Sequence, residues 1–114
     1  MFERLEISRL TQALVNHASA RQAVISGNVA NADTPGYRAR EVEDFATHLR
    51  RLTQGADAAP RLVAADPGAA LSPNGNSVSL ETEMMKAVET RHQFDKALAI
   101  YQSASSIIRA SLGR

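Results

Sequence analysis

The side chains that could bind a metal or move protons include three histidines, His17, His48 and His92. None has a Cys or a second His at the spacing that metal ligands require, and the chain has no cysteine. His17 and His92 also fall on two different predicted helices. We therefore expect no metal site and no disulfide, and we interpret His92 as a solvated or interface residue.

Three acidic residues, Glu41, Glu43 and Asp44, are close enough in sequence to suggest paired acids. A boundary between a loop and a helix explains them better, because the helix dipole favours carboxylates in the first turn. The sequence also has no glycine-rich phosphate loop, nucleophile elbow or Ser-His-Asp order. These patterns predict a protein that is not an enzyme and has no cofactor and no small-molecule substrate.

A modest group of arginines near Tyr37 could suggest RNA binding. No aromatic platform accompanies it, and acidic residues are interleaved with the basic ones. The whole chain carries 13 basic and 12 acidic residues, for a net charge of +1. We expect no nucleic-acid partner, and we interpret the group as a solvated or subunit-facing surface. Its members are Arg38, Arg40, Arg50 and Arg51.

The first element that must position these side chains is a predicted N-terminal helix. No Gly or Pro interrupts residues 2–26, which predicts a helix of about 25 residues, ~37 Å long. Steps of three and four along it indicate a coiled-coil seam, although several seam positions are polar. The predicted seam consists of Ile7, Leu10, Leu14, His17, Arg21, Val24, Asn28 and Asn31.

A second long helix is predicted at the C-terminus. Ser77 or Ser79 can cap its start, Glu81 and Glu83 lie in its first turn, and Gly113 ends it. Its length is roughly 33 residues, or ~50 Å. The predicted seam consists of Met84, Ala87, Arg91, Phe94, Leu98, Tyr101, Ser105, Ile108 and Leu112, widened by Val88 and Ile107.

The two seams include Arg21 and Arg91, which are unusual in a dry two-helix core. Two explanations remain open: the arginines meet acids of neighbouring subunits, or the seam register is wrong by one face. Aromatic residues make up only 4% of the chain, so a thick core is not expected. Each helix has one interrupted stripe, and we predict that the pair needs further partner chains.

Between the long helices, the chain changes in character. Phe45, Leu49 and Leu52 predict a short amphipathic helix near 43–54. Residues 55–76 are rich in Ala, Gly, Pro and Asp and predict an irregular linker. The prediction is thus all-α, with one discontinuous core domain. It consists of residues 1–36 as a helix with its exit turn, 37–76 as loop, short helix and linker, and 77–114 as the C-terminal helix.

The stretch NVANADTPGY, residues 28–37, forms the exit from the first helix. Thr34, Pro35, Gly36 and Tyr37 fit a type II turn, in which proline presets φ and glycine supplies the positive φ that follows. Asn28 and Asn31 lie on the seam face, where asparagine can fix register or bond the backbone groups that a helix end leaves free. On local physics alone, a well-made helix stop before a loop is the favoured interpretation of these residues.

Two motifs resemble a known family. ANADTPGY, continued by RAREVEDF, resembles the N-terminal signature of bacterial flagellar rod proteins, especially those of the proximal rod. NGNSVSLETEM, which leads into the C-terminal helix, is similar to the family's GN-x-V-x-L-x-x-EM segment. The resemblance covers about 28–45 and 74–112, and its two motifs occur in the expected order.

The resemblance implies a structural role. Members pair their terminal helices as a coiled-coil core and leave the cytoplasm through the flagellar type III export apparatus without a cleaved signal. They then assemble into the rod, the axial drive shaft that crosses the periplasm and encloses the export channel. The implied partners are other copies of the chain, other rod proteins, the adaptor FliE and the export gate.

Neither a signal-peptide core nor a segment of ~20 apolar residues appears in the sequence. The alternative function is a small helical coiled-coil adaptor or regulator unrelated to flagella, which would need neither motif. We predict that the helix exit depends on Asn28, Asn31, Thr34, Pro35, Gly36 and Tyr37. The predicted helix–helix or subunit interface consists of Leu10, Leu14, Val24, Met84, Val88, Phe94, Leu98, Tyr101, Ile108 and Leu112.

Overall fold

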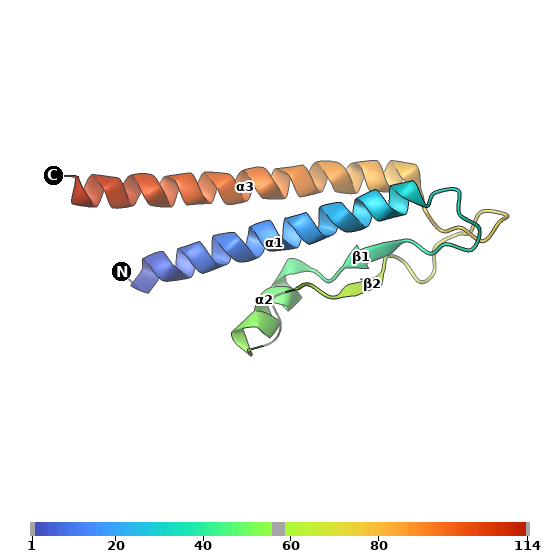
Figure 1. The fold of residues 1–114 in the computed structure, drawn as a ribbon, viewed down its shortest axis with the longest axis horizontal. Coiled ribbons are helices and arrows are strands. Elements are labelled where there is room, and N and C mark those ends of the chain that lie inside the picture. Colours follow the sequence, from blue (N-terminus) through green and yellow to red (C-terminus); the bar gives the residue numbers. More distant parts are fainter. Residues whose placement is uncertain (1, 56–58, 114) are drawn as a thin grey trace.

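The computed structural model describes residues 2–55 and 59–113, and it has the shape of a long helical hairpin. Helices α1 (Phe2–Ala30) and α3 (Leu80–Leu112) run antiparallel to each other, so that the two chain termini lie at one end (Figure 1). The molecule measures 66 × 28 × 18 Å, and its radius of gyration is 17.6 Å. A compact chain of this length would have a radius near 13 Å, so the fold is markedly elongated.

Helix α3 confirms the C-terminal prediction. It has 33 residues, and the Ser79 side chain caps it by accepting a hydrogen bond from the Thr82 amide at 3.3 Å. Helix α1 runs past Gly27 to Ala30, four residues beyond the predicted stop. A glycine inside a helix costs only about 1 kcal/mol relative to alanine, which other contacts of the turn can offset.

Helix α2 (Phe45–Thr53) confirms the short middle helix, but it corrects our interpretation of the acids. Asp44 is its N-cap and accepts a hydrogen bond from the Thr47 amide at 3.2 Å. Glu41 and Glu43 precede the helix and form ion pairs with other parts of the chain. Only Asp44 therefore serves the helix start.

The linker prediction for 55–76 was wrong in one part. Strand β2 (Leu62–Ala64) pairs antiparallel with β1 (Arg40–Val42), with Arg40 opposite Ala64 and Val42 opposite Leu62. Two strands of this length are marginal alone. They form here because Val42 is buried and β1 packs along α1. Residues 56–58 of the predicted linker lie outside the described residues.

The contact between α1 and α3 confirms part of the predicted seam, because His17, Arg21 and Asn28 all bond to side chains of α3, and it corrects the rest. On α1, Thr11, Ala18 and Ile25 are buried at intervals of seven residues. On α3 the buried residues, again seven apart, are Glu83, Thr90 and Ala97. The predicted Met84, Arg91 and Leu98, each one residue later, are exposed. Small side chains at the seam allow close approach; Met84 and Leu98 lie outside it, whereas Phe94 and Ile108 of the predicted seam are half-buried.

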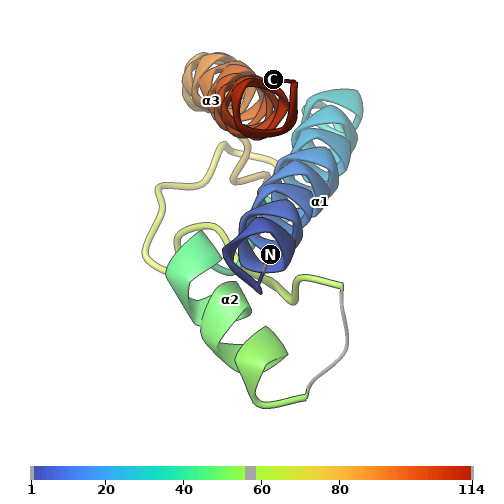
Figure 2. The same ribbon diagram turned by 90° about the vertical axis from the view of Figure 1, so that its left-hand side faces the viewer.

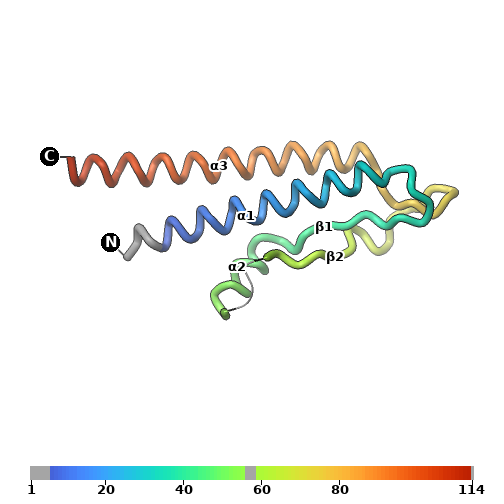
Figure 3. Tube along the Cα trace, viewed as in Figure 1, coloured from blue at the N-terminus to red at the C-terminus, as the bar shows by residue number. Residues whose placement is uncertain are grey.

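The hairpin is tight at its turn and open at its free ends. In Figures 1 and 2, the N-terminal part of α1 and the C-terminal part of α3 lie farther apart than the ends that meet near the turn. Leu112 is 71% exposed and Ile107 67%, near the end of α3. Figure 3 shows the same separation along the Cα trace, with β1, β2 and α2 on the side of α1 away from α3.

Candidate functional site

The turn predicted for Thr34–Tyr37 forms at the exit from α1. Gly36 has a φ of +74°, and the Tyr37 amide donates to the Thr34 carbonyl at 3.2 Å. The Asn31 side chain bonds back to the Gly27 carbonyl at 2.8 Å and accepts from the Thr34 hydroxyl at 3.0 Å. The glycine geometry and the hydrogen bond are those expected of a type II turn.

Asn28 is fully buried, and it joins three segments. Its Nδ2 donates to the Arg40 carbonyl and to Glu83 Oε1, each at 2.8 Å. Its Oδ1 accepts from the Arg40 amide at 3.0 Å and from the Tyr37 hydroxyl at 3.2 Å. This amide uses its full hydrogen-bonding capacity, so it fixes the start of β1 and the first turn of α3 against α1.

Asn76 makes the corresponding contacts from the second motif. Its Nδ2 donates to the carbonyls of Asn31 and Thr34, both at 2.8 Å. Its Oδ1 accepts from the Val78 amide at 2.7 Å. Carbonyls at a helix end have no partner within the helix, and Asn76 supplies one while holding the chain that leads into α3.

Main-chain bonds complete the connection between the two motifs. The Gly36 amide donates to Asn74 O and the Ser77 amide to Tyr37 O, each at 2.9 Å. Gly75 also has a positive φ, +84°, and a Cβ there would lie 3.5 Å from Gly36 Cα. We call this connected set the polar joint. It consists of Asn28, Asn31, Thr34–Tyr37, Arg40, Asn74–Ser77 and Glu83.

A chain of charges extends the joint along the hairpin. Lys86 Nζ lies 3.6 Å from Glu83 and 3.4 Å from Glu41, and Arg21 lies 3.1 Å from both Glu41 and Glu89. Burial alone would raise the pKa of Glu41, but the hydrogen bonds from Arg21 and the Val42 amide and the charges of Arg21 and Lys86 together hold that pKa below its usual value. Burial alone would likewise lower the pKa of Arg21, but Glu41 and Glu89 together raise it.

These pairs answer the question left open for the two seam arginines. Arg21 meets Glu41 and Glu89 of its own chain, so neighbouring subunits are not needed to neutralise it. Arg91 is highly exposed and lies 3.7 Å from Asp95. The register explanation therefore holds for Arg91, and internal pairing explains Arg21.

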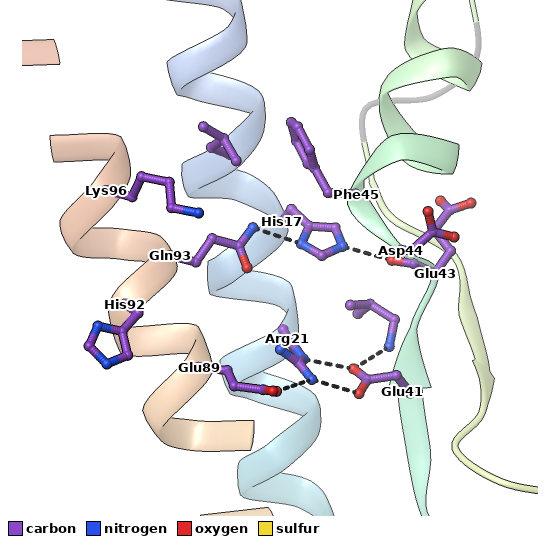
Figure 4. A pocket seen from close by; sticks show the side chains of 12 residues that line it. His17, Arg21, Glu41, Glu43, Asp44, Phe45, Glu89, His92, Gln93 and Lys96 are labelled. Atoms are coloured by element: carbon purple, nitrogen blue, oxygen red, sulfur yellow. Dashed lines mark hydrogen bonds and ion pairs between the residues drawn. The ribbon is translucent and has the colours of Figure 1, made fainter. Parts of the chain in front are cut away.

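A second set of buried polar side chains connects the start of α2 to α1 and α3 (Figure 4). His17 Nε2 lies 2.7 Å from the Glu43 carbonyl, and its Nδ1 lies 3.1 Å from Gln93 Nε2 on α3. These distances fit a neutral ring that donates through Nε2 and accepts through Nδ1. Arg51 forms an ion pair with the Glu43 carboxylate and lowers its pKa to about 2. One histidine thus links α1, α3 and the start of α2.

A cleft of about 550 Å³ runs past this group, between α1, α3 and the β1–α2 junction. Its buried acids are held in ion pairs, and His92 points away from His17 (Figure 4). Within residues 2–55 and 59–113, no group of His, Asp and Glu side chains could hold a metal ion. The side chains of the cleft thus make structural contacts between α1, α3 and the β1–α2 junction.

The structure brings the predicted exit residues together in the joint, and it leaves most of the predicted interface residues exposed. Asn28, Asn31, Thr34, Gly36 and Tyr37 all make hydrogen bonds in the joint. Most of the large interface residues are exposed in the single chain, and their contact with other chains stays a prediction. The exposed members are Leu10, Met84, Val88, Leu98, Tyr101 and Leu112.

Sequence reasoning missed the partners of the exit residues in the joint, which are Arg40, Asn74–Ser77 and Glu83. Asn76 and Glu83 are part of the second motif, which was the signal available in the sequence. The backbone of Arg40 carries no such signal, because every residue type except proline has the same amide and carbonyl. The His17–Gln93 contact joins residues 76 positions apart and likewise has no local signature.

The fold and the joint define a class of structural protein, an elongated helical hairpin with a locked turn and an open end. The family model described as the flagella basal body rod protein matches residues 9–38, from α1 through the turn. Within the described residues, no helix is long and apolar enough to cross a membrane.

Curated relatives match most of the chain. The flagellar basal body rod protein FlgB of Escherichia coli (strain K12) is 30% identical over 122 residues, covering 87% of this chain and 88% of the relative. FlgB of Agrobacterium fabrum is 27% identical and covers 87% of each chain. FlgB of Salmonella typhimurium is 43% identical over 53 residues, 46% of this chain and 38% of the relative. The chain therefore belongs to the flagellar basal body rod protein family.

Proposed function

We propose that the chain is a structural subunit of the proximal rod of the flagellar basal body. In this role it helps form the shaft that transmits torque and encloses the export channel. The proposal rests on family membership and on a likeness to relatives named FlgB. The alternative adaptor unrelated to flagella has no support from these comparisons.

The single structural observation that carries the proposal is the meeting of the two sequence motifs in one joint. Asn28 of the first motif bonds Glu83 of the second, and Asn76 of the second bonds the carbonyls of Asn31 and Thr34. Buried and fully bonded polar groups specify one geometry, because any displacement leaves a partner unsatisfied. A subunit that transmits torque needs a turn of this kind, which keeps two long helices in fixed register.

The predicted interface residues supply the subunit contacts in this proposal. Large apolar side chains lie on the outside of the hairpin, while the seam within it is lined largely by alanine, threonine and charged or amide side chains. The hydrophobic effect favours covering those outer side chains by other chains, and tubular assembly does so. Copies of this chain and other flagellar rod components are the partners that family membership supports.

The finer features follow from the family resemblance. We expect contacts with the adaptor FliE and the export gate at the membrane-proximal end of the rod. Export occurs through the flagellar type III system without a cleaved signal, and the assembled subunit lies in the periplasmic rod. A structural subunit needs no catalytic site. The acids of the cleft are held in ion pairs, which is consistent with a structural role.

Deletion of the gene tests the proposal. We expect purified basal bodies without a rod, cells without filaments, and recovery of both when the gene is supplied on a plasmid. Electron microscopy of the basal bodies scores the result. Normal rods in the deletion strain would contradict the proposed function.

A further inference from the structure

One asparagine of the polar joint has the sequence context in which this residue type is chemically least stable. Asn74 is exposed and is followed by Gly75, and no other asparagine of the chain precedes a glycine. Deamidation begins when the main-chain nitrogen of the next residue attacks the asparagine side chain, and glycine has no side chain to block that attack. Asn74 is therefore the asparagine that should deamidate fastest in the unfolded chain.

The reaction needs no reagent except water. The Gly75 nitrogen forms a bond to Asn74 Cγ and loses its proton to solvent, and the Cγ–Nδ2 bond breaks to release ammonia. Water then opens the cyclic imide at either of its carbonyl groups, which gives aspartate or isoaspartate. In isoaspartate the main chain runs through Cβ and Cγ, so it is longer by one methylene group.

The folded turn holds both reacting groups in hydrogen bonds. The Gly75 amide donates to Ser72 O at 2.8 Å, and the Ser72 amide donates to Asn76 O at 2.9 Å. Asn74 Oδ1 accepts from the Asn76 amide at 3.1 Å. An amide that donates a hydrogen bond gives up its proton less readily, so the reaction requires this turn to open.

The joint keeps the turn closed from its other side. Asn74 O accepts from the Gly36 amide at 2.9 Å, and a Cβ on Gly75 would lie 3.5 Å from Gly36 Cα. The buried Asn76 side chain is bonded to carbonyls just after α1. The loop before α3 and the exit from α1 thus lie side by side at the turn of the hairpin (Figure 1). Opening the turn breaks contacts between the two motifs.

We propose that Asn74 is a deamidation site that the closed polar joint protects, so that it reacts in chains whose joint is open. Isoaspartate at this position lengthens the main chain where Gly75 lies closest to Gly36, and the joint cannot then close with the same hydrogen bonds. Chains that remain unfolded are therefore open to a damage that folded chains escape. The inference does not depend on the rod function.

Mass spectrometry of the purified full-length protein tests the proposal. Samples are kept at mildly alkaline pH in native buffer or in guanidinium chloride, and trypsin then releases the peptide 62–86. We expect Asn74 to convert about tenfold or more slowly in the native sample, because only the opened fraction reacts. Asn76 lies in the same peptide before a serine, and it serves as the internal reference with slower conversion in the denatured sample.

A variant that opens the joint without changing the reacting pair sharpens the test. Asn76→Ala removes the side-chain bonds to the carbonyls after α1 but keeps the main-chain amide that bonds Asn74. Native Asn76→Ala protein should deamidate at Asn74 several-fold faster than the unmodified chain. Asn16→Ala, an exposed change on α1, is the matched control and should leave the rate unchanged. Circular dichroism checks that both variants remain helical, and the unmodified chain decides the question if Asn76→Ala does not fold.

Several results would overturn the proposal. Equal rates in the native and denatured samples would show that the fold does not protect Asn74, and faster conversion in the native sample would show that the turn promotes the reaction. No conversion in the denatured sample would show that Asn74 is not a deamidation site. An unchanged rate in folded Asn76→Ala would show that the joint does not control the site. None of these results affects the rod assignment, which the gene deletion tests separately.

The effect of isoaspartate on the joint is measured with protein that has reacted in denaturant and is then refolded. After a short pulse of protease, the cleaved fraction should contain more isoaspartate than the intact fraction. Asn74→Asp keeps the length of the main chain and should remain in the intact fraction. Equal isoaspartate content in both fractions would show that the joint tolerates the longer main chain.

Discussion

The two ends of the hairpin differ in the kind of side chain that they contain. At the turn, the contacts are polar and buried, with Asn28 and Asn76 each bonding several backbone groups. At the free ends, large apolar residues such as Ile107 and Leu112 are exposed on α3, and the two helices diverge. One end is held by contacts within the single chain, and the other leaves large apolar side chains exposed.

The difference indicates that the contacts at the turn determine the geometry of the subunit, whereas the free ends offer apolar surface for contact with other chains. Buried polar groups penalise every arrangement except the one that satisfies them, so the closed end sets the geometry of the subunit. Exposed apolar groups are less directional, so the open end gains stability from any well-fitting neighbour. Four predictions test this division, from the largest expected effect on the stability of the isolated chain to the smallest.

Replacement of Asn28 should have the largest effect. Asn28→Leu leaves the buried Glu83 and the Arg40 backbone without their partners, and we expect a loss of about 3 kcal/mol or more in the free energy of unfolding. Urea unfolding followed by circular dichroism measures it. Asn16→Leu is the matched control, because Asn16 is exposed on the same helix, and it should change stability by less than about 0.5 kcal/mol. If both variants lose the same free energy of unfolding, the buried contacts of the joint stabilise the fold no more than an exposed position does.

Valine at Gly36 should be the next most harmful change. A β-branched residue resists the φ of +74°, and we expect a cost of more than about 1 kcal/mol together with impaired motility. Gly27 provides a control of opposite sign, since it lies inside α1 with open space around it. Gly27→Ala should stabilise the chain by up to about 1 kcal/mol. Normal swimming with stable Gly36→Val protein would refute the turn assignment.

Acid should weaken the attachment of α2. The pKa of Glu43 falls from an ordinary 4.5 to about 2 in the folded chain, so its contribution is fully present above pH 4.5 and is lost as the pH falls toward 2. Unfolding midpoints in urea across this window should decline, and Glu43→Gln should flatten the decline. Glu6→Gln, an exposed change on α1, should keep the slope of the unmodified chain. An unchanged slope in Glu43→Gln would show that the Arg51 pair does not stabilise the fold.

Loss of the open end should barely affect the isolated chain while abolishing assembly. Removing residues 107–114 deletes the exposed Ile107 and Leu112, and we expect a change below about 1 kcal/mol in unfolding free energy. Rods should nevertheless be absent from purified basal bodies. Deleting 56–70 should permit rods more readily, although it removes β2 and its pairing with β1. Rods in the C-terminal truncation but not in the linker deletion would reverse the assignment of the interface.

The sequence carried enough information for the long helices but not for their contact. The cap at Ser79, the acids of the first turn and the absence of breakers specify α3 through local chemistry. Helix pairing was predicted from large apolar residues such as Met84 and Leu98, which is the usual rule for a chain that folds alone. Met84 and Leu98 are exposed, one residue beyond the buried Glu83 and Ala97, whereas Phe94 of the predicted seam is half-buried, so the rule identified only part of the seam.

The joint was predicted only in part, for a related reason. The turn at Pro35 and Gly36 follows from local backbone preferences. The partner of Asn28 is a glutamate 55 residues later, and strand β1 forms against a strand of three residues with little local signal. Nonlocal hydrogen bonds of this kind depend on the completed fold, and no spacing rule identifies them.

Hydrogen exchange on the dilute isolated protein tests the central claim most directly. The account predicts slow exchange for amides beside the joint, in the last half of α1 and from Glu83 to Ala97 of α3. Amides before Leu10 and after Tyr101 should exchange rapidly, because no second chain covers them. Uniform strong protection along both helices would show that the hairpin is complete in one chain, and it would contradict the division between a closed end and an open end.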